Sequence, residues 1–268
     1  MVTRIDHLSD LHFGAEDQAV VNALVEEINA DPPDLVVISG DLTQGARYSE
    51  FRGARTFMDR LTAPTLAVPG NHDITPYQLL ERFTDPYARW RATIGPETEP
   101  AWSDKTVAVV GLNTARRFGL NWDWSRGRVT RARLRRLIAR LDAVPDGVAR
   151  IVVAHHPLLP PEIEPRTPVA GGAAGALAAM TLHHVVLVLA GHLHHGGATL
   201  TTAGIERTLV LQGGTATSVR LREEPNAYNR VTVESRENVR VEVRVWDGRH
   251  WMTGSPHVVA AAAARREP

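Results

Sequence analysis

The stretch from Arg4 to His12 reads Arg-Ile-Asp-His-Leu-Ser-Asp-Leu-His. Its first part, Arg4 to Leu8, is a short run with Ile5 and Leu8 as its apolar residues, and we expect it to form a buried strand. Asp10 and His12 follow that run at once, and carboxylate and imidazole groups are both common metal ligands. An apolar strand that ends directly in such side chains predicts a functional site at its carboxyl end.

The same pattern occurs four more times along the chain. Each motif alone is weak, because Asp-x-His is more often a turn or a helix cap, and Gly-Asn-His-Asp can be a tight turn. Loops at the carboxyl ends of strands converge on one rim of an α/β sheet, so the joint occurrence favours a single metal site. The four further motifs are Gly40-Asp41, Gly70-Asn71-His72-Asp73, His155-His156-Pro157 and Gly191-His192-Leu193-His194.

The local spacing within these motifs also indicates a site. Glycine precedes Asp41, Asn71 and His192, which permits sharp turns and close approach of the backbone. Residues two apart on an extended segment point to the same side. Asp-x-His and His-x-His are therefore expected to present both side chains to one metal or to adjacent metals.

The remaining runs predict an α/β (α+β) fold in which a sheet is flanked by helices. Beyond residue 195 the pattern changes to alternation without helices, which predicts antiparallel strands that complete a second sheet. We expect residues 1–256 to form a single domain and residues 257–268 to be a frayed C-terminal tail. The expected strands are 4–8, 35–39, 65–68, 107–112, 150–154, 185–190, 198–202, 208–212, 228–233 and 239–245, and the expected helices are 17–30, 49–61, 76–92 and 130–141.

Composition limits the chemistry that the chain can perform. It has 268 residues, enough for one large core, and no cysteine, which excludes disulfides, thiolate nucleophiles and cysteine zinc sites. Any metal must be bound through imidazole, carboxylate or amide oxygen. The 30 basic residues balance the 30 acidic ones, so no stable nucleic-acid partner is expected.

Localisation and assembly are less constrained by the sequence. The N-terminus lacks a basic region and a long apolar run, so a cytoplasmic protein is expected. The most apolar stretch, residues 185–190, is too short to cross a bilayer, and no membrane association is expected. Homo-oligomer formation leaves no clear mark in a sequence and stays open.

Taken together, the motifs resemble the signature of the calcineurin-like metallophosphoesterase superfamily over residues 6–195. The resemblance implies a four-layer sandwich of two mixed β-sheets flanked by α-helices, with two divalent metal ions. Mn, Fe or Zn are expected, and Co or Mg would also suit such ligands. By this resemblance the first metal is bound by Asp10, His12 and His194, the second by Asn71, His155 and His192, and Asp41 bridges them.

Within the superfamily, the sequence looks most like the bacterial class III cyclic nucleotide phosphodiesterases. Ser9 to His12, Gly70 to Asp73 and His155 to Pro157 carry that likeness, as do the segments 214–218 and 226–229. The chain departs from those relatives after Pro157, where Leu158-Leu159 replaces the second proline, and in the unusual segment 160–176.

The expected reaction is hydrolysis of a small phosphodiester of the 3′,5′-cyclic nucleotide type. Two cations that share a carboxylate lie roughly 3.5–4 Å apart and hold a bridging hydroxide as the nucleophile. His72 is not a ligand by the resemblance and is expected to protonate the leaving alkoxide, with Asp73 orienting its ring. Asn113, His156 and His195 are candidates for substrate binding.

Several alternatives stay open at the level of sequence. Trp122 and Trp124 lie among arginines and either stack a base or anchor an ordinary surface loop. The same metal core also serves phosphomonoesterases and hydrolases of glycerophosphodiesters or nucleotide pyrophosphates. A nuclease and a metal-binding module without catalysis are further alternatives.

Overall fold

The strands form two sheets of six strands each in the computed structural model, which describes residues 1–76, 78–117, 125–161, 165–194, 196–203, 206–221 and 224–254. The first sheet has the order β12 (Trp251–Thr253), β11 (Val239–Trp246), β10 (Ala227–Val233), β1 (Thr3–Leu8), β2 (Leu35–Ile38) and β3 (Thr65–Ala67). The second has the order β4 (Ala101–Ser103), β5 (Val107–Gly111), β6 (Ala149–Val153), β7 (Val185–Ala190), β9 (Glu206–Gln212) and β8 (Gly197–Ala203). Each sheet combines parallel with antiparallel pairs, so the predicted pair of mixed sheets is confirmed.

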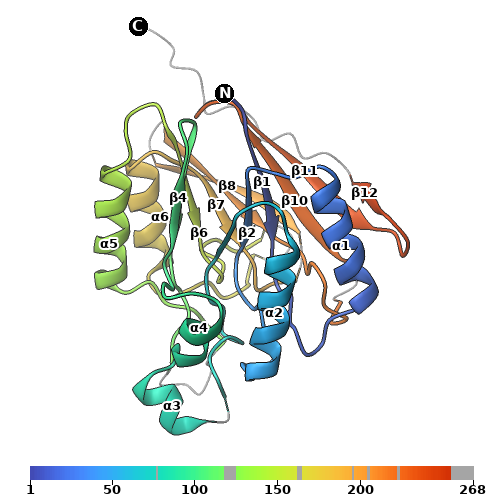
Figure 1. The fold of residues 1–268 in the computed structure, drawn as a ribbon. Helices are drawn as coiled ribbons and strands as arrows, with labels where there is room; N and C mark the ends of the chain where they lie inside the picture. Colours follow the sequence, from blue (N-terminus) through green and yellow to red (C-terminus); the bar gives the residue numbers. More distant parts are fainter. Residues whose placement is uncertain are drawn as a thin grey trace, which may run out of the picture.

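Helices cover both outer faces of the sheet pair, as Figure 1 shows. One face carries α1 (Gln18–Ala30) and α2 (Tyr48–Arg60), and the other carries α5 (Arg131–Asp142) and α6 (Ala173–Leu182). Two short helices, α3 (Leu79–Thr84) and α4 (Ala88–Thr93), lie in the connection between β3 and β4. Among the described residues, no helix is both long and apolar enough to span a bilayer.

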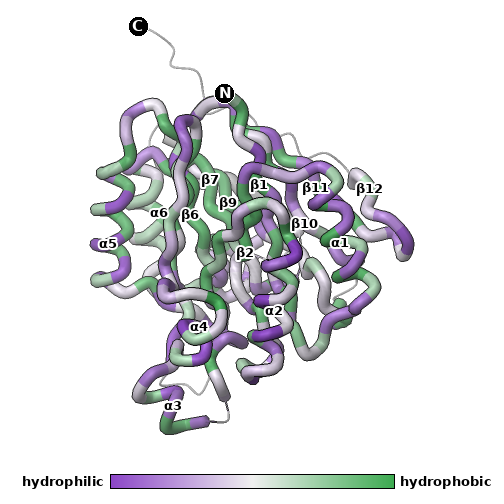
Figure 2. Tube along the Cα trace, viewed as in Figure 1, coloured by the Kyte–Doolittle hydropathy of each residue, from purple (hydrophilic) through white to green (hydrophobic). Residues whose placement is uncertain are grey.

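Successive side chains of each strand point to opposite faces of the sheet, and this alternation produces the layers. On β2, Leu35 and Val37 belong to the cluster between the two sheets, whereas Val36 and Ile38 belong to the cluster under α1 and α2. On β6, Ile151 faces the inner cluster and Val152 faces α5 and α6. The central strands are therefore apolar on both faces, and Figure 2 shows β6, β7 and β9 largely in green.

The segment after residue 195 differs from the prediction. It does not complete one sheet: β8 and β9 extend the second sheet, whereas β10, β11 and β12 extend the first. The segment therefore crosses between the two layers. β9 also pairs in parallel with β7, because β8 turns back before β9 and restores the direction of β7.

Other elements differ in their boundaries. The helix expected over 76–92 is two helices, since Pro86 lacks a donor and restricts the residue before it. The short strands β4 and β12 were not predicted, and neither was α6, whose residues 173–182 offer no polar face. The tail 257–268 lies outside the described residues, and the single domain over residues 1–256 stays a prediction.

A buried ion pair joins β1 to β10 on the face that α1 covers. Asp6 and Arg230 are paired across the strands, and the guanidinium donates to both carboxylate oxygens at 2.9 and 3.0 Å. The Asp6 side chain is fully buried. Burial raises the pKa of Asp6, and the hydrogen bonds and charge of Arg230 oppose that rise.

Removal of one partner of this pair should cost more than removal of both. Arg230→Met leaves a buried carboxylate without its cation and should lower the free energy of unfolding by about 3–5 kcal/mol. The double variant Asp6→Leu/Arg230→Met should recover most of that loss, as measured by urea unfolding. A double variant as unstable as the single one would contradict this account.

Candidate metal centre

The predicted ligands lie on loops that leave the carboxyl ends of parallel strands in both sheets. Asp10 and His12 follow β1, Asp41 follows β2, and Asn71 follows β3. His155 follows β6, and His192 and His194 follow β7. Backbone hydrogen bonds connect neighbouring loops, including Asp10 N to Gly40 O at 3.1 Å and Gly191 N to His155 O at 2.9 Å. The two sheets thus contribute to one site.

The first ligand group consists of Asp10, His12 and His194, all of which are buried. Asp10 Oδ1 lies 3.6 Å from His12 Nε2 and 3.4 Å from His194 Nε2. The two Nε2 atoms are 3.4 Å apart, and their rings are stacked with 5.1 Å between centroids. Three ligand atoms from distant parts of the chain therefore converge on one point.

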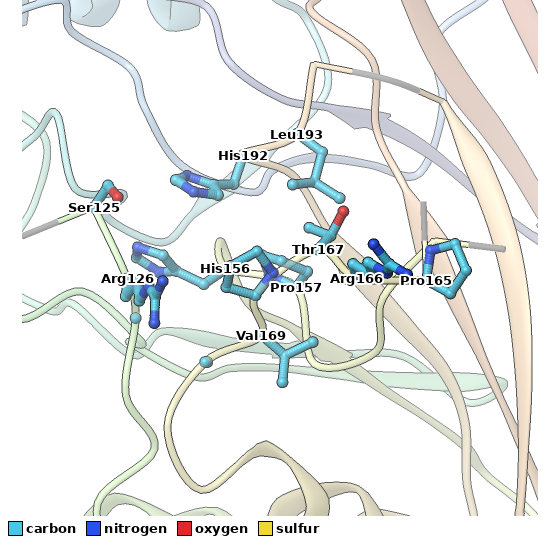
Figure 3. A pocket seen from close by; sticks show the side chains of 13 residues that line it. Ser125, Arg126, His156, Pro157, Pro165, Arg166, Thr167, Val169, His192 and Leu193 are labelled. Atoms are coloured by element: carbon cyan, nitrogen blue, oxygen red, sulfur yellow. The ribbon is translucent and has the colours of Figure 1, made fainter. Parts of the chain in front are cut away.

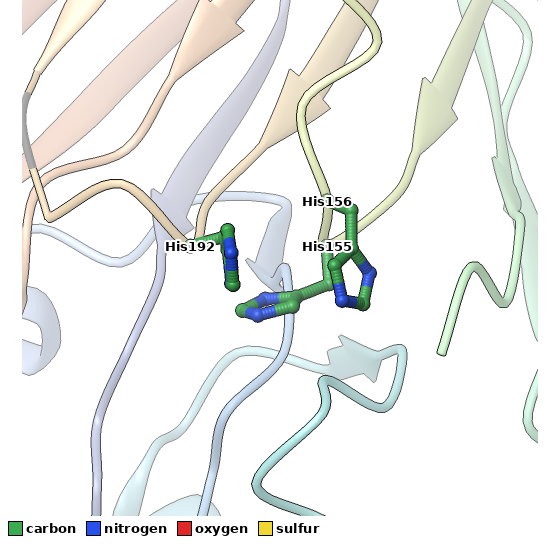
Figure 4. A group of neighbouring side chains, drawn as sticks. All are labelled: His155, His156 and His192. Atoms are coloured by element: carbon green, nitrogen blue, oxygen red, sulfur yellow. The ribbon is translucent and has the colours of Figure 1, made fainter. Parts of the chain in front are cut away.

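The second group is built around His155, with Asp41 between the two groups. Asp41 Oδ2 lies 3.3 Å from His155 Nε2 and 3.9 Å from His12 Nε2. His192 brings its ring to 5.2 Å from that of His155, centroid to centroid. Figure 4 shows His155 and His192 meeting from neighbouring loops, with His156 beside them. Asp41 thus contacts residues of both groups, and its bridging role stays a prediction.

Other protein groups fix the far side of each ligand. His155 Nδ1 contacts the carbonyl of Ser39 at 2.9 Å, and His194 Nδ1 contacts the hydroxyl of Thr215 at 2.6 Å. The outer oxygen of Asp10 accepts from His192 N, and that of Asp41 accepts from His72 N, both at 2.9 Å. Such contacts orient metal ligands and select the histidine tautomer.

The inner atoms fit a pair of divalent cations. Asp10 Oδ1, Asn71 Oδ1 and His155 Nε2 are buried and have no hydrogen-bond partner, which is costly unless another group compensates them. Their types are carboxylate, amide and imidazole, the ligands expected for Mn, Fe or Zn in a chain without cysteine. The residues present therefore fit the divalent cations that the resemblance implies.

The carboxylates and histidines of the site shift one another's pKa values. Burial would raise the pKa values of Asp10 and Asp41, but the surrounding histidines hold both well below the usual range. Burial would lower the pKa of His155, yet Asp41 and Asp10 raise it to about 9. The pKa of His192 is lowered to about 4 by burial and by the charge on His155. The carboxylates and histidines of the site thus compensate part of one another's charge.

The ligand motifs were expected to be extended segments. The backbone of the site is instead turned at most ligands. Asp10, His12, Asp41, His192 and His194 all have positive φ, between 49° and 77°. Asp and His tolerate this left-handed region better than most residues, although each instance costs on the order of 1–3 kcal/mol. The Asp-x-His and His-x-His pairs converge through these turns and not through the period of a strand.

His72 and Asp73 have different surroundings from each other. The ligand atom of His72 lies within 4.8 Å of those of His12 and Asp41, and its Nδ1 contacts the carbonyl of Gln44 at 2.7 Å. The predicted contact between Asp73 and His72 is wrong. Both Asp73 oxygens instead accept from Gly70 N, Leu42 N, Thr43 N and Thr43 Oγ1.

The remaining candidates divide into three cases. The side-chain oxygen of Asn113 accepts from the hydroxyl of Tyr87 and from Ala115 N, so this oxygen holds its own loop, and a substrate role for Asn113 stays a prediction. His156 is buried next to His155 and His192. His195 lies outside the described residues, as do Trp122 and Trp124.

The segments 214–218 and 226–229, which were noted only for their likeness to the cyclic nucleotide phosphodiesterases, support the site. Besides the contact of Thr215 with His194, Thr217 Oγ1 donates to the carbonyl of Leu11 at 2.9 Å. Asn226 donates to the carbonyls of Thr215 and Ser218. These hydroxyl and amide contacts stabilise the loop after β1. The sequence spacing of Thr215, Thr217 and Asn226 does not predict these contacts.

A model of the calcineurin-like phosphoesterase family matches residues 3–196, which is more than half of the chain and includes every predicted metal ligand. The chain belongs to this family. It is therefore a metal-dependent phosphoesterase, as the arrangement of strand ends and ligands predicts.

Two curated relatives have names that specify diesters. Glycerophosphodiester phosphodiesterase GpdQ of Enterobacter lignolyticus is 37% identical over 78 residues, which are 25% of this chain and only 28% of that relative. A probable cyclic nucleotide phosphodiesterase of Synechococcus is 26% identical over 216 residues, 75% of this chain and 78% of the relative.

Solved phosphatase structures share the fold. Purple acid phosphatase PPD1 from yellow lupin has a TM-score of 0.71 at 13% identity, over 94% of this chain and 53% of its own. A dimetal phosphatase from Danio rerio has a TM-score of 0.66 at 14% identity, over 94% of this chain and 98% of its own. The four-layer sandwich is thus confirmed.

Close backbone approach at the predicted glycines can be tested directly. A Cβ on Gly70 would lie 2.0 Å from Asp41 Oδ1, so Gly70→Ala must displace the carboxylate between the two ligand groups. We expect this variant to bind metal at least tenfold more weakly, as measured by metal content after dialysis.

Gly95→Ala is the matched control, because a Cβ there meets nothing within 4 Å. Equal metal content in the two alanine variants would show that the contact between Gly70 and Asp41 does not matter.

Proposed function

We propose that this chain is a dinuclear metal-dependent phosphodiesterase. The observation that carries the proposal is the place of Asp41, whose Oδ2 lies 3.3 Å from His155 Nε2 and 3.9 Å from His12 Nε2. Asp10, His12 and His194 would hold one cation, and Asn71, His155 and His192 the other. Two bound cations would activate water as the nucleophile and offset charge on the phosphoryl oxygens.

The substrate that we propose is a small diester of the 3′,5′-cyclic nucleotide type. The Synechococcus relative, which matches three quarters of this chain, supports this class by its name. The segment shared with the glycerophosphodiester phosphodiesterase favours glycerophosphodiesters as the second candidate. In both candidate substrates the phosphate is esterified to alcohols, so the leaving group is an alkoxide.

His72 would act on the leaving oxygen. Its Nδ1 donates to the carbonyl of Gln44 at 2.7 Å, which fixes one proton on that nitrogen. The His72 ring lies 4.9 Å from that of His12, centroid to centroid, so Nε2 is the nitrogen left for the substrate. In the imidazolium form, Nε2 carries a second proton that an alkoxide leaving group can take. On this proposal the carbonyl of Gln44, and not Asp73, would orient the ring of His72.

Hydrolysis by metal-stripped protein refilled with Mn, Fe, Zn, Co or Mg tests the proposed function. We expect turnover of bis-nitrophenyl phosphate and cyclic AMP to require added metal and to exceed turnover of nitrophenyl phosphate and of glycerophosphoethanolamine. Asp41→Ala should abolish all activity, because it removes the group shared by both ligand sets. Preference for the monoester would overturn the proposal.

The leaving-group role of His72 predicts a dependence on substrate. An alkoxide needs a proton to leave, whereas nitrophenolate does not, so His72→Ala should lower kcat for cyclic AMP by about a hundredfold and affect bis-nitrophenyl phosphate much less. Metal content should stay at that of the unaltered protein. Loss of one metal equivalent would instead make His72 a ligand.

A further inference from the structure

A pocket of about 660 Å³ opens beside the second ligand group, as Figure 3 shows. His156 and His192 line this pocket and also belong to a cluster of nitrogens close enough to share a metal. The pocket is therefore continuous with the place where the phosphate would react. Its volume lies within the range of about 300–1,000 Å³ that is usual for small-molecule sites.

The lining of the pocket suits an organic group. Much of its wall is apolar, from Pro157, Pro168, Val169 and Leu193. Arginines 126 and 166 also line it, and no carboxylate is among its described lining residues. A methyl or glycerol group would leave most of this volume filled with water, whereas an aromatic or nucleoside group would displace that water and bury apolar area.

His156 is held rigidly between the pocket and the ligands. Its exposed fraction is 1%, its Nδ1 lies 2.8 Å from Thr114 Oγ1, and its backbone N–H donates to the same oxygen at 3.2 Å. A Cβ on Gly127 would lie 2.3 Å from His156 Cγ, so the ring packs directly on that backbone. His156 Nε2 is buried without a hydrogen-bond partner.

We infer that this pocket binds the retained alcohol of the diester, that this alcohol is bulky and largely apolar, and that His156 Nε2–H donates to an oxygen of the same substrate. This role requires the tautomer in which Thr114 Oγ1, which accepts the backbone N–H of His156, gives its own proton to Nδ1, so that the ring proton is on Nε2. The ring centroid lies 4.9 Å from that of His192, so the bound oxygen would be next to the reacting phosphate. This inference rests on the proposed function.

Two synthetic diesters with one leaving group test the inference. Methyl nitrophenyl phosphate and 1-naphthyl nitrophenyl phosphate both release nitrophenolate, so they differ in the retained alcohol alone. We expect kcat/KM to favour the naphthyl ester at least tenfold in the metal-loaded protein. Thr167→Trp, which fills the pocket, should reduce this ratio to about one.

Variants of His156 separate a substrate contact from a metal ligand. His156→Ala should lower kcat/KM for the naphthyl ester about tenfold while two metals per chain remain, and His156→Gln, which keeps a donor, should recover part of it. His183→Ala is the control, because His183 pairs with Asp142 on the surface at 2.7 Å and should change neither ester. Loss of a metal equivalent in His156→Ala would overturn the assignment.

The remaining outcomes distinguish failure of the pocket assignment from failure of the proposed function. Equal turnover of the two esters would overturn the pocket assignment and leave the phosphodiesterase in place. If neither ester is hydrolysed, the proposed function fails, and calorimetric binding of 1-naphthyl methylphosphonate then decides the pocket. Binding that Thr167→Trp abolishes supports the assignment, and binding that it leaves intact refutes it.

Discussion

Two buried carboxylates lie at the centre of the structure, and the surrounding residues compensate their charge. Asp10 and Asp41 are at most 2% exposed, so each would be costly to hold as an anion without a cationic partner. Histidines from both sheets supply that compensation and hold both pKa values low. The same histidines offer nitrogen to a metal. Charge balance and metal binding are thus two results of one arrangement.

The sheets bring these groups together, and the backbone accepts strain to do so. Parallel strands from two layers end at one rim, and left-handed turns at five ligands then direct the side chains inward. Such turns persist only where neighbouring structure over-determines them. The contact of Gly70 with Asp41, and that of Gly191 with Ser9, leave no room for a Cβ. Loop backbones therefore pack as closely as a protein core does.

The sequence predicts the central strands and the convergence of their ends because both depend on local patterns. Short runs rich in apolar or β-branched residues predict β2, β5, β6 and β7 almost to the residue, and the run that ends in Leu8 predicts β1. The division of β8 to β12 between two sheets is not local, since it depends on which sheet edge each strand meets. α6 was missed because a helix of alanine and leucine that packs on one sheet needs little polar surface.

In the site, too, contacts between distant segments could not be predicted from the sequence. Ligand types follow from motifs, but the partners behind them come from distant segments, as with Thr215 behind His194 and Ser39 behind His155. Asp73 adjoins His72 in sequence, yet its carboxylate serves the backbone of Leu42, Thr43 and Gly70. Adjacency in sequence was the wrong guide, because the turn at Asn71 sends the two side chains to different neighbours.

The two ends of the site have different chemistry, and this difference constrains the substrate. His72 lies near His12 and Asp41, whereas the pocket adjoins His155, His156 and His192. On the proposed roles, the leaving oxygen faces the first group and the retained alcohol faces the second. In a cyclic nucleotide one ribose supplies both oxygens, so only the base can extend into the pocket. Selection among diesters would then depend on the group that fills that pocket, because the metal centre would contact only the phosphate, which all diesters share.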